Sequence, residues 1–172
     1  RRHHPQAGKV YVAGIDLAGE AEAVEGAALT EIKPGRDATV VTIGELDYSS
    51  VTGLQKQPVV NVVEHYSWTG KKHTELYPQL VDIIKTVWHC RKVIVDSTGV
   101  GQPVSSFLRA AVGPAIVPFV FTQPSKSRLG FNLLAALNSG LLKMYTGDGS
   151  AEYQRFWFEM EKAKSHYRPS QT

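Results

Sequence analysis

Two aspartates, Asp16 and Asp96, each end a short apolar run that predicts a buried strand, over Val10 to Leu17 and Lys92 to Asp96. Open α/β sheets present ligand sites at the carboxyl ends of their strands, so neighbouring parallel strands would place the two carboxylates side by side. Like charges that close destabilise each other unless a cation lies between them, and oxygen ligands suit Mg²⁺ or Mn²⁺. The pair predicts a divalent metal site. Either aspartate taken alone is equally compatible with a strand-end residue that caps the next loop.

The residues after Asp96 strengthen the metal-site hypothesis. Ser97 to Gly101 (STGVG) forms a small, glycine-containing turn. Such a turn lets a nucleic-acid backbone approach closely, although by itself it is also a common tight link from strand to helix.

Five strands are expected from the apolar and β-branched runs. The second and third strands should form an antiparallel hairpin with a long loop, and the first should be buried on both faces. Pro118 places the fifth strand at a sheet edge or a bulge. The five strands are Val10 to Leu17, Ala38 to Gly44, Val59 to Tyr66, Lys92 to Asp96 and Ala115 to Phe121.

Four helices complete the predicted order. The first has Leu76, Leu80, Ile83, Ile84 and Val87 at helical spacing, with Thr74 as its cap and Pro78 in its first turn. Two follow, over Val104 to Ala111 and about Ser125 to Ser139, then a short extended piece from Leu141 to Tyr145. The last carries Tyr153, Phe156, Trp157 and Met160 as a core-packing stripe. The fold class is therefore α/β: a mixed five-stranded sheet in a hairpin-led β-β-β-α-β-α-β order, with helices on both faces.

Composition narrows the functional classes. The 172 residues, 42% of them apolar, suit one domain, and the single Cys90 excludes an internal disulfide, so we expect a cytoplasmic setting. No apolar stretch approaches the ~20 residues of a membrane span, so we expect no membrane partner. The net charge of +3 and pI near 9.0 permit a polyanionic partner. Because the sequence starts at Arg1 and not Met, we expect a piece of a longer chain.

The two acidic strings carry a family resemblance. Gly14 to Leu17 (GIDL) and Val93 to Gly101 (VIVDSTGVG) resemble the acidic motifs of the nuclease domain of phage large terminases. The likeness extends through Lys126 to Tyr145 and Glu152 to Lys164, so most of the chain is covered in order.

The resemblance implies an RNase H-like domain over residues 1–172 that cuts double-stranded viral DNA during genome packaging, with little sequence specificity. Acids on the first and fourth strands, Asp16 and Asp96, would hold two Mg²⁺ or Mn²⁺ ions together with a third acid. The resemblance also implies an upstream ATPase domain in the same polypeptide, portal and small terminase partners, and a location in the host cytoplasm.

The third acid is missing from the sequence. The family's His-Asp-Asp-like motif does not appear before Thr172, so we expect the third carboxylate on a few tens of further residues. Asp148 and Glu152 are weak internal candidates, the first because Thr146 to Gly149 indicates a turn. Asp37 could lie behind a metal ligand, but a turn residue is the stronger interpretation.

Other polar residues receive simpler interpretations. Lys126 and Arg128 are candidate DNA-phosphate contacts. The scattered histidines are interpreted as surface or packing residues: His65, His73, His89 and His166.

Three alternatives stay open. Gly14 to Leu17 also resembles the phosphate-binding hairpin of actin-like and sugar-kinase-like ATPases, which need a second domain and a second glycine-rich loop. A transposase or Holliday-junction resolvase would share the fold and metals. An inactive module that binds only DNA or a portal partner would explain the missing acid.

Overall fold

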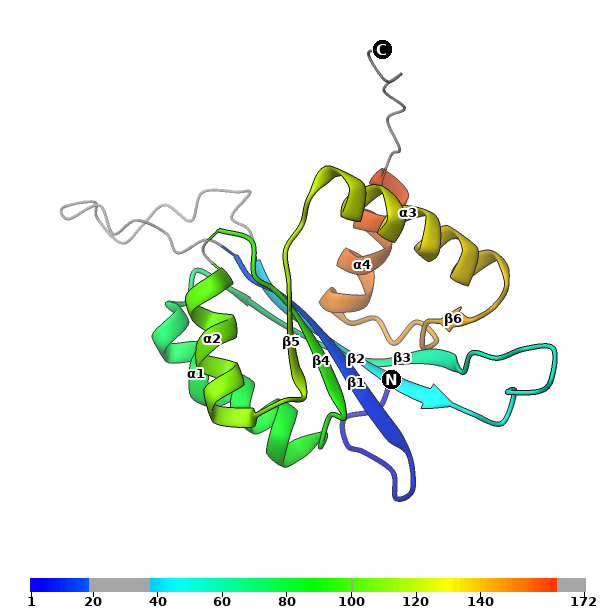
Figure 1. Cartoon of the computed structure of the whole chain (residues 1–172), viewed down its shortest axis with the longest axis horizontal. Coiled ribbons are helices and arrows are strands. Elements are labelled where there is room, and N and C mark those ends of the chain that lie inside the picture. Colours follow the sequence, from blue (N-terminus) through cyan, green and yellow to red (C-terminus); the bar gives the residue numbers. More distant parts are fainter. Residues whose placement is uncertain (19–37, 100, 164–172) are drawn as a thin grey trace, which may run out of the picture.

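A single mixed sheet organises the chain (Figure 1). The computed structural model describes residues 1–18, 38–99 and 101–163. In the described part the sheet has six strands and not the expected five, in the order β5-β4-β1-β2-β3-β6. The strands are β1 (Val10–Asp16), β2 (Ala38–Asp47), β3 (Val59–Thr69), β4 (Lys92–Asp96), β5 (Ile116–Phe119) and β6 (Leu142–Lys143).

The strand pairings are those that the metal-site hypothesis requires. β1 pairs antiparallel with β2 and parallel with β4, with Ile15 opposite Val95. The predicted antiparallel hairpin of β2 and β3 is confirmed. The predicted edge position of the Pro118 strand is also confirmed, because among the described strands β5 pairs only with β4, at one end of the sheet. The sixth strand is the expected short extended piece, which pairs parallel with β3 over two residues.

The hydrophobic core lies on one face of the sheet. Alternate residues of β1, namely Tyr11, Ala13 and Ile15, are at most 5% exposed, whereas Gly14 and Asp16 between them are exposed. The prediction that the first strand is buried on both faces is therefore wrong. We call the second face, which carries Gly14 and Asp16, the open face. The run looked continuous because small and apolar residues occupy both sides of the strand.

Three helical segments cover the core face, as the lower left of Figure 1 shows: α1 (His73–Val81), a π-helix η1 (Asp82–Val87) and α2 (Gly101–Val112). They bury Leu80, Ile84 and Leu108 completely. Trp88, also fully buried, donates its indole N–H to the hydroxyl of Tyr66 over 2.9 Å.

Two details of the first helix were predicted wrongly. α1 begins at His73, one residue before Thr74, and Lys72 precedes it without a side-chain capping bond. Pro78 consequently lies inside the helix and not in its first turn. In place of the predicted side-chain cap, the start of the helix has a tertiary contact. Nε2 of buried His73 lies 2.9 Å from the carbonyl oxygen of Ala18.

The remaining helices, α3 (Gln123–Asn138) and α4 (Ala151–Lys162), follow β5 and β6. Figure 1 places them across the sheet from α1 and α2, so helices occupy both faces as expected. α4 meets β3 where the Phe156 ring lies 5.4 Å from the His65 ring. No residue of α4 is buried, so interpreting its aromatic stripe as core was wrong. α3 buries only Ser125, and its leucines stay exposed.

The N-terminal segment lies along the edge of β3. The backbone N–H of Arg2 donates to the carbonyl oxygen of Val63 over 2.9 Å. Nε of Arg1 lies 2.5 Å from the carboxylate of Glu64, which is 2% exposed, and Arg2 pairs with buried Glu45. Both strand carboxylates are thus neutralised by arginines about 40 to 60 positions earlier in the chain. No helix in the part of the chain that the structure describes is both long and apolar enough to cross a membrane.

Candidate metal centre

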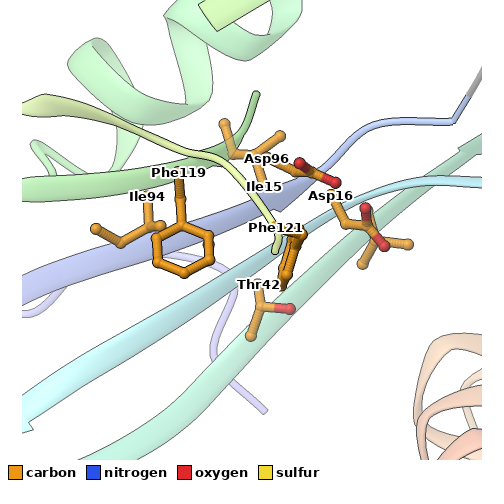
Figure 2. Close-up of a pocket in the computed structure, with 9 residues that line it drawn as sticks. Ile15, Asp16, Thr42, Ile94, Asp96, Phe119 and Phe121 are labelled. Atoms are coloured by element: carbon orange, nitrogen blue, oxygen red, sulfur yellow. The ribbon is translucent and has the colours of Figure 1, made fainter. Parts of the chain in front are cut away.

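Asp16 and Asp96 line one pocket on the open face, at the carboxyl ends of β1 and β4 (Figure 2). The parallel pairing of the two strands brings them there, because Ile15 lies opposite Val95 and each aspartate is the next residue. The pocket has a volume of about 280 Å³. Its other lining residues are Gly14, Ile15, Val40, Thr42, Ile94, Phe119 and Phe121.

The loop after β4 orients Asp96. The backbone N–H of Thr98 donates to Oδ1 of Asp96 over 2.8 Å. The carboxylate is half-buried, and this bond leaves its second oxygen available to a ligand.

Gly101 allows α2 to begin against the end of β4. A Cβ atom at Gly101 would stand 2.2 Å from the backbone oxygen of Asp96. Ser97 is held behind the same turn, since its hydroxyl lies 2.7 Å from that of buried Ser105. Gly101 is the last residue of the turn that was predicted to admit a nucleic-acid backbone, and its structural role is to let the helix pack beside the aspartate.

Thr42 brings a hydroxyl to the pocket from β2, and Figure 2 shows it below the two carboxylates. Its Oγ1 lies 3.1 Å from Nδ1 of His65 on β3. His65 is 4% exposed, so the packing interpretation applies to it, and its ring contacts those of Tyr145 and Phe156. Burial lowers the pKa of His65, against the opposing charge of Glu64. The lowered pKa favours the neutral form of the imidazole beside Thr42.

The weak internal candidates for a third ligand lie elsewhere. Asp148 accepts hydrogen bonds from the backbone N–H and hydroxyl of Ser150, which caps α4, so it has a local structural role of the kind that the turn interpretation gave it. Those two bonds, with help from Arg1, lower the pKa of Asp148 to about 2. Glu152 lies 3.2 Å from Nη1 of Arg1. Neither lines the pocket that holds Asp16 and Asp96.

Asp16 and Asp96 gain no third acidic or metal-binding neighbour in the described residues. Over residues 1–18, 38–99 and 101–163, no group of three His, Cys, Asp or Glu side chains could hold a metal ion. Asp37 and His166 lie outside the described residues.

The predicted DNA contacts both lie near the start of α3. Lys126 and Arg128 are exposed, and Nζ of Lys126 lies 5.7 Å from the centre of the Phe121 ring. Phe119 and Phe121 themselves were not recognised from the sequence. The only signal in the sequence was that the two phenylalanines, which follow Pro118, are two residues apart. In an extended chain this spacing places both rings on the same side.

The fold is that of phage terminase nucleases. No protein-family model and no curated protein matches the chain by sequence. Among solved structures, it is similar to the large terminase nuclease from thermophilic phage G20c with bound zinc, at a TM-score of 0.59 and 17% identity, over 88% of this chain and 72% of that one.

The cobalt-bound and further structures of the G20c nuclease give TM-scores of 0.58 and 0.56, at 17% and 15% identity. They are matched over 82% and 85% of this chain, which spans 60% and 63% of theirs. The predicted resemblance is confirmed at the level of the fold, and the RNase H-like α/β class with it.

Proposed function

We propose that this domain is a metal-dependent endonuclease that cuts double-stranded viral DNA during genome packaging. The observation that carries the proposal is the shared pocket of Asp16 and Asp96, at the ends of adjacent parallel strands. The fold supports it, because the similar G20c structures are terminase nucleases, two of them with bound zinc or cobalt.

The donor set of the pocket suits a hard divalent cation. Its side-chain donors are two carboxylates and the hydroxyl of Thr42, with no cysteine or histidine among the lining residues. Oxygen ligands of this kind favour Mg²⁺ or Mn²⁺ over the softer metals that cysteine selects. Two aspartates supply too few oxygens for two ions, so we expect one ion here, and the third carboxylate beyond Thr172 stays a prediction.

When bound, such a metal supplies activation of water and neutralisation of phosphate charge. The chain's own groups do the positioning. Asp16 and Asp96 would bind the cation, with the Asp96 carboxylate fixed by the Thr98 N–H. Lys126 and Arg128, both exposed, would hold DNA phosphates without reading bases, which fits cleavage with little sequence specificity.

The first test is Mn²⁺ binding by calorimetry with the 172-residue chain. We expect one ion to bind, and Asp16→Asn and Asp96→Asn each to abolish binding. Asp82→Asn is the control, because Asp82 is an exposed aspartate on η1, away from the pocket. Mn²⁺ binding unchanged in both pocket variants would show that the metal centre has been assigned to the wrong residues.

The second test is cleavage of supercoiled plasmid with Mg²⁺ or Mn²⁺. Cleavage should be slow for this chain, faster when the chain is lengthened by a few tens of residues, and absent in the Asp16→Asn and Asp96→Asn variants of the longer form. Wild-type cutting by either variant would refute the mechanism. Binding of an ATP analogue by the isolated chain would favour the actin-like alternative instead.

The third test is the salt dependence of DNA binding. Affinity for duplex DNA should fall steeply as salt rises, and Lys126→Gln or Arg128→Gln should each reduce the slope of log affinity against log salt by about one. Lys85→Gln should leave the slope unchanged, because Lys85 lies on η1 with its Nζ 3.4 Å from the carbonyl oxygen of Ala111 on α2. Affinity that does not respond to ionic strength would contradict phosphate binding.

A further inference from the structure

Two phenylalanines form one wall of the pocket beside the carboxylates. Phe119 ends β5 and Phe121 follows two residues later, and both line the pocket with Asp16 and Asp96. Figure 2 shows the two rings on the near side of the pocket, with Phe121 between Phe119 and Asp16 in the view. Their centres are 5.1 Å apart, with an interplanar angle of 75°.

Burial does not account for these rings. Both are half-buried, and neither belongs to the hydrophobic core, which lies on the opposite face of the sheet. The two rings border the two carboxylates on the open face. A ligand bound to those carboxylates would therefore contact the rings.

The aromatic wall is fixed to the same loop that orients Asp96. The N–H of Phe121 donates to the hydroxyl of Thr98 over 2.9 Å, and the N–H of Thr98 donates to Asp96. The N–H of Ser97 donates to the carbonyl oxygen of Phe119 over 2.8 Å. The backbone that carries the wall thus has a defined position relative to Asp96.

The chain beyond Phe121 is fixed as well. Thr122 caps α3 in a reciprocal capping box with Ser125, which sets the direction of the helix immediately after the ring. The helix then carries Lys126 back over Phe121, with its Nζ 5.7 Å from the ring centre. Lys126 does not line the pocket, so its ammonium leaves the pocket side of the ring open.

An aromatic ring beside a cation is a combination that binds single nucleotides, since the ring stacks on the base and the cation attracts the phosphate. A paired base in a duplex is stacked on its neighbours and cannot reach a ring beside its own phosphate. An unpaired base can turn outward and stack on such a ring.

We propose that Phe119, Phe121 and Lys126 form a binding platform for one unpaired base of the strand whose phosphate lies at Asp16 and Asp96. This rests on the proposed nuclease function and deepens it. The occupant is a nucleobase in locally melted or mismatched DNA. Such a domain prefers sites where the duplex is already open.

The test compares the affinity of the 172-residue chain for two oligonucleotide duplexes. One duplex is fully paired, and the other has the same length with two mismatched nucleotides at its centre. Fluorescence anisotropy with Ca²⁺, an oxygen-binding cation that offsets the charge of the two carboxylates, should show tighter binding to the mismatched duplex by about fivefold to a hundredfold, the range that one stacked base contributes. A 2-aminopurine placed in the mismatch should be quenched on binding.

Variants assign the preference to the ring. Phe121→Leu should bind both duplexes equally, at the wild-type affinity for paired DNA, whereas Phe121→Trp should keep the preference. Phe131→Leu is the matched control, because Phe131 is 71% exposed on α3 and lies outside the pocket. Thermal unfolding of each variant verifies that the fold is intact.

Equal wild-type affinity for the two duplexes overturns the platform, as does a preference that survives in Phe121→Leu or an absence of any DNA binding. Failure of the proposed function is separate, because metal binding at Asp16 and Asp96 is measured without DNA, and the base preference is assigned by Phe121→Leu, which leaves both aspartates in place. A preference for mismatched DNA in a chain that binds no Mn²⁺ would keep the platform and reject the nuclease.

Discussion

The backbone N–H of Thr98 donates a hydrogen bond of 2.8 Å to Oδ1 of Asp96. The aspartate thus makes a structural bond that needs an acceptor, and under the proposed function it also binds a cation, which needs a negative charge. Asp96→Asn keeps the acceptor and removes the charge, whereas Asp96→Ala removes both. We expect the Asn variant to unfold at the wild-type temperature and the Ala variant to lose about 1 kcal/mol. Thermal and urea unfolding measure this, and equal stability of the two variants would show that the bond contributes nothing.

Gly101 is the position where one methyl group should do most damage to the site. Gly101→Ala would place a Cβ 2.2 Å from the backbone oxygen of Asp96, so α2 or the end of β4 must move. We expect a loss of about 2–4 kcal/mol in unfolding free energy, and weaker Mn²⁺ binding in the variant that remains folded.

Gly130 provides the matched control. It lies in α3, and a Cβ there would meet nothing within 4 Å. Gly130→Ala should therefore stabilise the domain by up to about 1 kcal/mol, because alanine is the better helix former. If both substitutions had the same effect, the tight packing at Gly101 would not matter in solution.

Arg1 and Glu64 form the most buried ion pair at the edge of β3. Burial opposes the charge of Arg1, but the hydrogen bond and charge of Glu64 outweigh it and raise the pKa of the guanidinium. Arg1→Met should cost about 2–3 kcal/mol, because it removes the guanidinium from the 2% exposed carboxylate and leaves it the backbone N–H of His65 at 2.9 Å and the exposed ring of His3 at 2.6 Å.

A double-mutant cycle tests that origin of the cost. If an unpaired buried charge is the cause, Arg1→Met with Glu64→Leu should be destabilised by less than the sum of the single variants. Urea unfolding gives the four free energies. Strict additivity would mean that the two side chains stabilise the domain independently.

His65 should make stability depend on pH. Burial lowers its pKa in the folded state below the 6.5 of the unfolded chain, while Glu64 and Glu152 raise it and Arg1 lowers it further. Between the two pKa values the unfolded state binds the proton more readily than the folded state. The stability that neutral His65 contributes is therefore full above pH 6.5 and is lost as the pH falls towards the pKa of the folded state.

We therefore expect the unfolding temperature of the wild type to fall more between pH 7 and pH 5 than that of His65→Asn. The asparagine can still bond to Thr42 near the position of Nδ1 but does not titrate. Identical pH profiles for the two proteins would place the sensitivity on other groups.

The sequence predicted the placement of the two aspartates because strand-end acids after apolar runs are a local pattern. The run from Val10 to Asp16 nevertheless led to the wrong prediction that both faces of the strand are buried. Val12 and Gly14 face the open side although neither is a polar residue. The Thr74 cap failed because a tertiary contact of His73 sets the start of α1. The π-helix at Asp82–Val87 has no residue signature, because only its hydrogen-bond pattern differs from that of an α-helix.

The aromatic wall and the ion pairs could not be predicted for a different reason. Phe121 acquires its role through a hydrogen bond to Thr98, 23 positions earlier, and Glu64 through Arg1, 63 positions earlier. Periodicity describes neighbours along the chain and contains no information on such pairs. Glu64 lies in the middle of an apolar run, where a buried charge needs a partner, but the sequence does not show which residue that partner is.

β1 fills the hydrophobic core with one side and lines the pocket with the other, which divides the strand into two kinds of position. If every single substitution in β1 were scored separately for protein abundance and for DNA cleavage, the two scores should alternate along the strand. Tyr11, Ala13 and Ile15 should limit abundance, because their side chains fill the core. Substitutions at Gly14 and Asp16 should leave abundance unchanged and reduce cleavage. A Cβ at Gly14, for example, would meet no atom within 4 Å but would project into the pocket.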